Sequence, residues 1–487
     1  MIYTINKTIP SPRLKDIYKH LWIPSKKNDP KNIFVGDDFT NLIPVDKEQI
    51  LLKNIIDSIR AAEETIFIAS FLFSHKEITS SLKEAAKRGV RVYLLTASEN
   101  KLNTSPEEGD FEKRTLEEHK TFLNEMAKLI LIRSAENFHF KLLLIDVKKK
   151  SRQGFLFTNN ITEKALLENP EIGLELSSQS TIELANFFSW CFWEKATHEQ
   201  SLQKSHRAVK TPGKLSYIPS KTNLIFSGKD IFEKDRILPS LMKMIQSAKQ
   251  TIEIASFSFG DENSQLTKLL CEKAKDNVSI HVYGRESRFK QYDYFQFLQQ
   301  KQIKIFGIPL LHFKLVLIDK NKGILMTANL DDRSLTNSYE IGKILNLEEV
   351  FAARQILEAY KKRYHFEYFD KLTGKDLIEK DLPVDSINFY PSSGKKREVT
   401  INKAQIQISD KRKISCLTEL LHLQEDTSKV NSLPLCKSIS YKWEIELPYL
   451  ASDYKPSEEK LEEKHGIKIY IKEGLNKKKK PSIKDKV

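Results

Sequence analysis

One pattern of histidine, lysine and aspartate occurs twice in the chain, and its residue types could cleave a phosphodiester. The two copies are His139-Phe-Lys141-Leu-Leu-Leu-Ile-Asp146 and His312-Phe-Lys314-Leu-Val-Leu-Ile-Asp319. The apolar surroundings are typical of a strand, on which His and Lys, two residues apart, share one face. A neutral imidazole can attack phosphorus, and a protonated imidazole can supply the leaving oxygen with its proton. The doubled motif is therefore a candidate for nucleophilic and acid–base chemistry at phosphorus.

Further polar residues follow each copy at comparable offsets. They are Thr158, Asn159 and Asn160 after the first copy, and Thr327, Ala328 and Asn329 after the second. A glutamate then closes each copy, Glu171 in Asn-Pro-Glu and Glu340 in Asn-Ser-Tyr-Glu. Two lysines and two asparagines converging on the non-bridging oxygens would neutralise the phosphate and hold its developing charge.

The elements that must position these residues form an internal repeat. Residues 61–73 return as residues 247–259, and both segments contain Thr-Ile-x-Ile-Ala-Ser-Phe, which is typical of a buried strand. The pattern predicts helices at 50–60, 76–88, 237–247 and 264–275, and strands at 90–96, 129–133, 278–283 and 303–306. Strands that alternate with helices indicate an α/β fold with a largely parallel sheet.

Together the doubled motif, the asparagines and the glutamates resemble the phospholipase D superfamily, over roughly Asn32 to Asp370. The resemblance implies two α/β repeats related by a pseudo-two-fold axis, with the active site at their interface. It also implies His139 as nucleophile, His312 as general acid/base, and Lys141, Lys314, Asn160 and Asn329 as phosphate-binding groups. Glu171 and Glu340 would fix the imidazole tautomers, and Asp146 and Asp319 would brace the motif through buried hydrogen bonds.

The chain departs from the family pattern where Gly-Ser is usual, because it has Phe157-Thr158 and Met326-Thr327. Threonine keeps the hydroxyl, so Thr158 and Thr327 are expected to bind phosphate. The loss of glycine adds bulk near the strand, which makes the substrate class harder to transfer from the family.

The predicted organisation is an N-terminal arm (1–30), two phospholipase D-like repeats (31–215 and 216–370), an accessory domain (371–470) and a basic tail (471–487). The accessory domain is expected to be β-rich or α+β, from short alternating runs such as 398–408 and 438–447. An insertion at 101–112, which only the first repeat carries, is expected to be a surface loop and a candidate lid.

Composition limits the function classes without choosing among them. The 487 residues carry 79 Lys and Arg against 65 Asp and Glu, a net charge of +14, which favours an anionic partner. Four scattered cysteines indicate a reducing, cytoplasmic location. No apolar run is long enough to span a bilayer, so the form of membrane attachment that stays open is peripheral binding. Neither a cofactor nor a metal is expected, and one chain already holds both motifs, so an oligomer is not required.

Three substrate readings remain open. Nucleic acid, favoured by the basic charge and by the Glu-Ile-Gly endings, would make the protein a metal-independent nuclease. The alternative is a phospholipase D or phosphatidyltransferase on anionic phospholipid, because Asn329-Leu-Asp-Asp-Arg-Ser334 is similar to the second motif of cardiolipin synthases. The third reading is a non-catalytic, phosphate-binding protein.

Overall fold

Two compact units make up the chain. The computed structural model describes residues 2–9, 17–24, 39–46, 48–98, 113–200, 206–208, 222–231, 236–285, 291–363, 366–373, 400–407, 439–446 and 468–472. The larger unit comprises residues 29–286 and 297–364 and contains both motif copies. The smaller unit comprises residues 1–28, 287–296 and 365–487.

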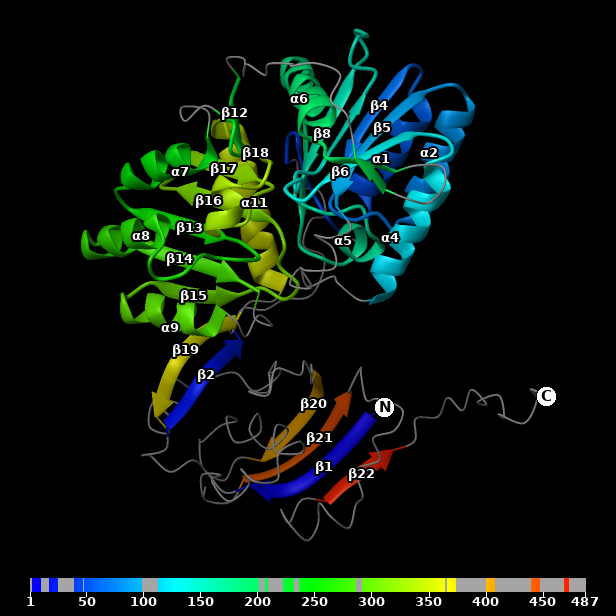
Figure 1. The fold of residues 1–487 in the computed structure, drawn as a ribbon. Helices are drawn as coiled ribbons and strands as arrows, with labels where there is room; N and C mark the ends of the chain where they lie inside the picture. The colour runs from blue at the N-terminus through cyan, green and yellow to red at the C-terminus, as the bar shows by residue number, and fades with distance from the viewer. Residues whose placement is uncertain are drawn as a thin grey trace, which may run out of the picture. The chain divides into compact units, whose positions relative to one another are not determined.

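The first half of the larger unit is a mixed sheet covered by helices (Figure 1). Its strands are β3 (Leu42–Pro44), β4 (Thr65–Ala69), β5 (Arg91–Ala97), β6 (Leu131–Ala135), β7 (Leu142–Ile145), β8 (Gln153–Phe157), β9 (Ile172–Glu175), β10 (His198–Gln200) and β11 (His206–Ala208). Its helices are α1 (Ile50–Ala61), α2 (Lys76–Lys87), α4 (Lys113–Met126), α5 (Glu163–Leu167) and α6 (Ser178–Trp190), which continues into the π-helical turn η1 (Cys191–Lys195).

The second half repeats this plan. Its strands are β12 (Leu224–Ser227), β13 (Thr251–Ala255), β14 (Ser279–Gly284), β15 (Lys304–Gly307), β16 (Lys314–Ile318), β17 (Lys322–Met326) and β18 (Glu340–Ile344). Its helices are α7 (Ile237–Gln246), α8 (Gln265–Lys275), α10 (Asp332–Thr336) and α11 (Leu347–Arg363), while α9 (Tyr292–Gln300) spans the boundary between the two units along the chain.

The strand order is the same in both halves. It reads β3-β9-β8-β7-β4-β5-β6 in the first half and β12-β18-β17-β16-β13-β14-β15 in the second. Only the β4-β5-β6 and β13-β14-β15 ladders are parallel. The other ladders of these sheets are antiparallel, so the prediction of a largely parallel sheet was wrong. Short connections across β7-β8 and β16-β17 return the chain directly, and such hairpins can only be antiparallel.

The helices cover the sheets because each has one apolar face. In α1 the buried residues include Leu52, Ile55, Ile56 and Ile59, at the spacing of one helix face. Helix α8 begins at Ser264, whose hydroxyl accepts a hydrogen bond from the Thr267 backbone N–H, as a good N-cap does. Among the described residues, no helix is both long and apolar enough to cross a membrane.

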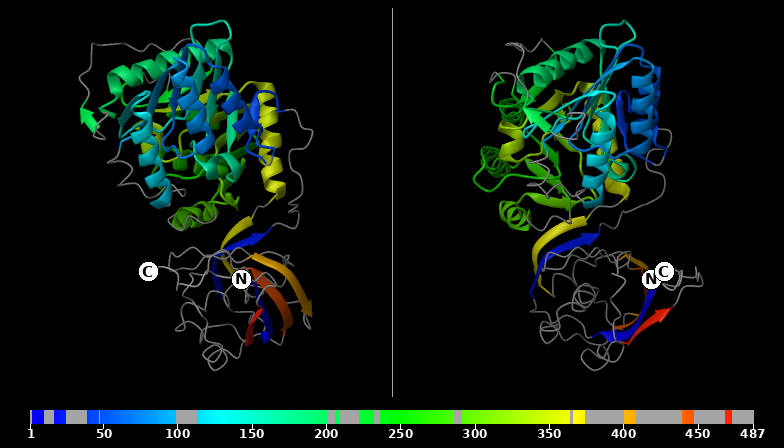
Figure 2. Two further views of the ribbon diagram at one scale, coloured as in Figure 1. Left: turned by 90° about the vertical axis from the view of Figure 1, so that its right-hand side faces the viewer. Right: turned by 45° about the vertical axis from the view of Figure 1, so that its right-hand side comes forward.

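One apolar core joins the two halves through α6 and α11. Phe187 and Phe188 of α6 and Ile356 and Tyr360 of α11 belong to the same buried cluster as residues of both sheets. The ring of Phe187 lies 4.6 Å from that of Phe226 on β12, a contact across the halves. Figures 1 and 2 show α6 and α11 on the sides of the two sheets that face each other. This shared core holds the two halves in one fixed arrangement.

In the smaller unit, strands from both ends of the chain share one sheet. Its order is β20 (Thr400–Gln407), β21 (Ile439–Glu446), β1 (Ile2–Ile9) and β22 (Lys468–Lys472). An antiparallel ladder joins β2 (Ile17–Pro24) to β19 (Phe366–Thr373). The predicted domain bounds stay predictions, and the insertion at 101–112 and most of the basic tail lie outside the described residues.

Candidate active site

Each histidine is placed by a backbone contact with the opposite half. The N–H groups of His139 and Phe140 both donate to the carbonyl of Tyr339, at 3.2 and 3.1 Å. At the equivalent position of the second half, the N–H groups of His312 and Phe313 donate to the carbonyl of Pro170, each at 3.2 Å. Tyr339 and Pro170 directly precede Glu340 and Glu171. The crossing therefore brings the histidine of each half next to the glutamate of the other.

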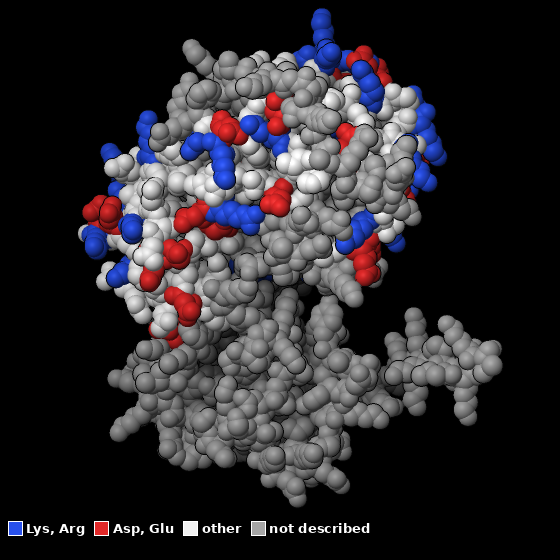
Figure 3. Space-filling model, in the orientation of Figure 1, with Lys and Arg blue, Asp and Glu red and all other residues white. Residues whose placement is uncertain are grey.

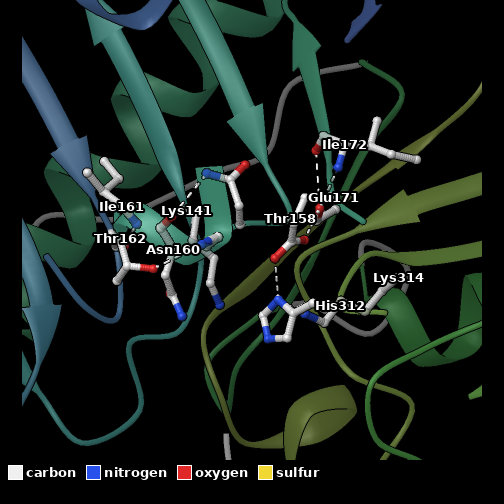
Figure 4. Close-up of polar contacts among 12 residues, drawn as sticks. Lys141, Thr158, Asn160, Ile161, Thr162, Glu171, Ile172, His312 and Lys314 are labelled. Carbon is white, nitrogen blue, oxygen red and sulfur yellow. Dashed lines mark hydrogen bonds and ion pairs between the residues drawn. The ribbon is translucent and has the colours of Figure 1, made fainter. Parts of the chain in front are cut away.

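The two histidines and the two glutamates form crossed pairs. His139 Nδ1 lies 2.6 Å from Glu340 Oε1. His312 Nδ1 lies 2.5 Å from Glu171 Oε1, the pair labelled in Figure 4. Both carboxylates are completely buried. A carboxylate can only accept, so each Nδ1 carries its hydrogen and each Nε2 is left for chemistry. A ring held in this way presents Nε2 as a nucleophile when neutral and as an acid when protonated.

The two threonines orient these glutamates. Thr158 Oγ1 donates to Glu171 Oε2 at 2.6 Å, and Thr327 Oγ1 donates to Glu340 Oε2 at 2.6 Å. Each hydroxyl also accepts a backbone N–H, from Ile172 or Ile341. Each threonine is thus the outer member of a Thr–Glu–His chain. Phosphate binding by these two hydroxyls stays a prediction.

Both motif lysines are buried inside the site. Lys141 and Lys314 have no exposed surface, and Lys141 Nζ lies 3.1 Å from His139 Nε2. Lys314 Nζ lies 3.4 Å from His312 Nδ1. Figure 4 shows Lys141 and Lys314 in the same site, although they come from different halves. A pair of buried ammonium groups is costly unless an anion compensates it, and a phosphate would do so.

The two motif asparagines have unused hydrogen-bonding capacity. Asn160 is fully buried, and neither atom of its amide has a partner among the described residues. Asn329 is also buried, and its Oδ1 lacks a partner within the described part of the chain. Buried polar groups are usually paired, so these amides indicate a polar ligand at this position.

Both motif aspartates lie away from the imidazoles and hold the start of a strand. Asp146 accepts the backbone N–H groups of Glu63, Glu64 and Thr65. Asp319 accepts those of Lys249, Gln250 and Thr251, at the equivalent place in the second half. Burial would raise the pKa of each carboxyl, but the three amides outweigh it and hold both pKa values below their usual range.

The repeated Ala-Ser-Phe segments supply a contact that was not predicted. Phe71 packs edge-on against His139 at 5.3 Å, and Phe257 lies 5.0 Å from His312. The equal spacing of Ala-Ser-Phe in the two repeats is the sequence signal that points to this contact. His119 is fully buried, and its Nδ1 accepts a hydrogen bond from the Phe73 backbone N–H.

The glycine of each Glu-Ile-Gly ending has a packing explanation. A Cβ on Gly173 would collide with the Leu51 side chain, and one on Gly342 would crowd Ile225. These endings therefore do not discriminate between substrate classes. Among the described residues, no group of three or more His, Cys, Asp or Glu side chains is placed to hold a metal ion.

Comparison with known proteins identifies the family. The family model described as "Cardiolipin synthase, PLD-like domain" matches residues 55–192 and 241–362, which together exceed half of the chain. The chain belongs to this family. It is a phospholipase D superfamily phosphodiesterase, as the two halves and their paired motifs indicate.

Individual relatives are distant. Cardiolipin synthase A of Buchnera aphidicola subsp. Baizongia pistaciae is 23% identical over 340 residues, which cover 64% of this chain and 67% of that protein. Cardiolipin synthase of Geobacillus kaustophilus is 25% identical over 348 residues, with 65% of each chain covered. The crystal structure of phosphatidylserine synthase from Haemophilus influenzae Rd KW20 shares the fold, with a TM-score of 0.52, 11% identity and coverage of 71% of this chain and 89% of that one.

Proposed function

We propose that this protein is a phosphatidyltransferase that moves a phosphatidyl group from one phospholipid to an alcohol of another. The observation that carries the proposal is the pair of crossed His–Glu contacts, which hold both imidazoles through Nδ1 so that the Nε2 atoms can act on a phosphate. The family model and the relatives named cardiolipin synthase support phospholipid as the substrate class. Hydrolysis of the same bond is the corresponding reaction when water replaces the acceptor alcohol.

In the first step, His139 acts as the nucleophile. Its Nε2 lone pair forms a bond to phosphorus while the P–O bond to the leaving alcohol breaks. His312, protonated on Nε2, gives that proton to the leaving oxygen. Glu340 stabilises the positive charge on His139 through Nδ1–H, and Lys141, Lys314 and the two asparagines bind the non-bridging oxygens.

In the second step, the reaction runs backwards with a new alcohol. The neutral Nε2 of His312 takes the hydroxyl proton of the acceptor as its oxygen attacks phosphorus, and the P–N bond to His139 breaks. Both histidines return to their starting protonation states. The number of P–O bonds is unchanged, so no external energy source is required.

Phospholipid is better supported as the substrate class than nucleic acid, which the net positive charge favoured. The family and relatives support the lipid alternative and give the nuclease reading less support. On the face drawn in Figure 3, the described Lys and Arg side chains are interspersed with Asp and Glu. The proposed partner is an anionic phospholipid surface to which the protein binds peripherally.

The test incubates purified protein with vesicles that contain phosphatidylglycerol and, separately, with labelled single- and double-stranded nucleic acid, all in EDTA. A His139→Ala/His312→Ala double variant is the matched control. We expect wild type alone to convert phosphatidylglycerol into a lipid with two phosphatidyl groups plus glycerol. Release of phosphatidic acid alone would indicate a hydrolase. Cleavage of nucleic acid by wild type alone, with lipid untouched, would refute the proposal.

A further inference from the structure

Within the part of the chain that the structure describes, Arg285 is a buried cation without an acidic partner. It directly follows β14 and is only 2% exposed. Among the described residues its Nη1 has no hydrogen-bond partner, and none of their acidic side chains forms an ion pair with it. Arginine remains charged at any pH that the protein meets, so it cannot escape the cost of burial by losing a proton.

The position of this guanidinium connects it to the active site. Its Cζ lies 5.6 Å from the centre of the Phe257 ring, over the ring. The same ring lies 5.0 Å from the imidazole of His312. Phe257 therefore contacts both groups, and Arg285 borders the His312 side of the site. A cation–π contact with one ring offsets only part of the cost of burying the charge.

The first half of the unit has no equivalent cation. In the β4-β5 ladder Ala69 pairs with Leu95, and in the β13-β14 ladder Ala255 pairs with Tyr283. Counting two residues onward places Ala97 where the second half has Arg285. Phe71 still contacts His139 in the first half, so the fold and the imidazole contact do not need the arginine. At this position the arginine is specific to one of the two halves.

We infer that Arg285 binds a second phosphate of the substrates, beside the one that is transferred. A guanidinium pairs with phosphate through two parallel N–H donors, and such a ligand would supply the missing charge. Under the proposed function, on which this inference rests, the second phosphate belongs to the phospholipid that enters or leaves on the His312 side. The inferred substrate class is therefore one in which the acceptor or leaving alcohol carries a phosphate of its own.

Binding without turnover tests the inference independently of the transferase activity. Titration calorimetry on the full chain would compare propane-1,3-diol bisphosphate with n-propyl phosphate. We expect wild type to bind the bisphosphate about tenfold more tightly, as a charge-assisted hydrogen-bonded pair allows. Arg285→Gln should lower this affinity ratio at least about fivefold, and Arg285→Lys should retain part of it. The exposed Arg91→Gln, at the start of β5, is the control and should keep the wild-type ratio.

An equal ratio in wild type and Arg285→Gln, or the absence of any preference in wild type, would overturn the inference. Thermal unfolding of Arg285→Met without ligand separates binding from packing. Replacing an uncompensated buried charge with an apolar side chain should leave the unfolding midpoint unchanged or raise it. A lower midpoint together with an unchanged affinity ratio would show that Arg285 serves packing and not a ligand.

Discussion

The two halves of the catalytic unit agree closely in their His–Glu and Thr–Glu contacts and differ in the packing behind the sheets. Each has a His–Glu contact of 2.5–2.6 Å and a Thr–Glu contact of 2.6 Å. Behind the sheet, however, Phe67 of β4 stacks on Phe188 of α6, whereas the matching Glu253 of β13 is paired with Arg354 of α11. Under the proposed function the two halves bind one phosphate, so they need equivalent donors. The core needs only side chains that fill its volume and pair its buried polar groups. The comparison separates residues that serve chemistry from residues that serve packing.

The largest expected difference between the two halves is in the roles of their histidines. His139→Ala and His312→Ala should each lower turnover by at least about 10⁴-fold, because each removes a group that acts in the transition state. Only His312→Ala should accumulate a covalent phosphoryl-protein from radiolabelled substrate, since its nucleophile is intact. The label would be measured after rapid quenching in base, which preserves a P–N bond. Label on His139→Ala instead would reverse the assigned roles.

Crossed pairing makes a prediction about the glutamates. Glu340→Gln should slow formation of the intermediate, and Glu171→Gln should slow protonation of the leaving group. Each should lower kcat by about 10³-fold, because an amide no longer stabilises the imidazolium charge or enforces the tautomer. Single-turnover kinetics would resolve the two steps. If Glu340→Gln left the chemistry of His139 untouched, the crossed arrangement would not operate in solution.

The packing difference predicts unequal effects on stability. Phe188→Ala removes a ring that is 1% exposed and stacked at 5.0 Å on Phe67, so we expect a loss of about 3–5 kcal/mol in the free energy of unfolding. Arg354→Ala removes the partner of Glu253 and a 2.6 Å bond to the Asp319 carbonyl, for about 1–3 kcal/mol. Urea titrations at low and high salt measure both. Only the arginine variant should lose its defect as salt rises.

Substitution of the two threonines should lower kcat by a smaller factor, which depends on whether the new side chain keeps a hydroxyl. Thr158→Val and Thr327→Val remove the hydroxyl that donates to Glu171 or Glu340, and each should lower kcat about 10- to 100-fold. Serine at either position should restore most of the activity because it keeps the donor. A rise in KM with kcat unchanged would point back to direct phosphate binding.

The two aspartates predict how acid destabilises both halves. Each carboxyl has a folded-state pKa below its ordinary value, so its contribution to stability is present above the unfolded-state pKa and is lost as pH falls through the folded-state pKa. The wild-type unfolding midpoint should therefore fall between about pH 5 and pH 3. Asp146→Asn/Asp319→Asn should be less stable at neutral pH and flatter over this interval. An equally steep fall in the variant would assign acid sensitivity to other groups.

Much of the site followed from local pattern. His139 and Lys141 are adjacent on one strand face in any register, and the repeat placed a second copy at His312 and Lys314. Strand and helix positions were close to those observed, with β5 at 91–97 against the predicted 90–96. The prediction of a largely parallel sheet was wrong. The sequences of β7 and β8 are typical of buried strands, and this pattern does not indicate whether neighbouring strands are parallel or antiparallel.

The doubled motif and the repeat that carries it can be read from the residues alone, and they indicate phosphodiester chemistry. Which glutamate contacts which histidine follows only from the folded chain, because His139 and Glu340 are 201 residues apart and no local period links them. The same holds for Thr158, whose hydroxyl goes to Glu171, and for β1, which pairs with β21 near the opposite end of the chain. Motifs record local geometry, whereas pairing across the halves depends on how two sheets pack against a shared core.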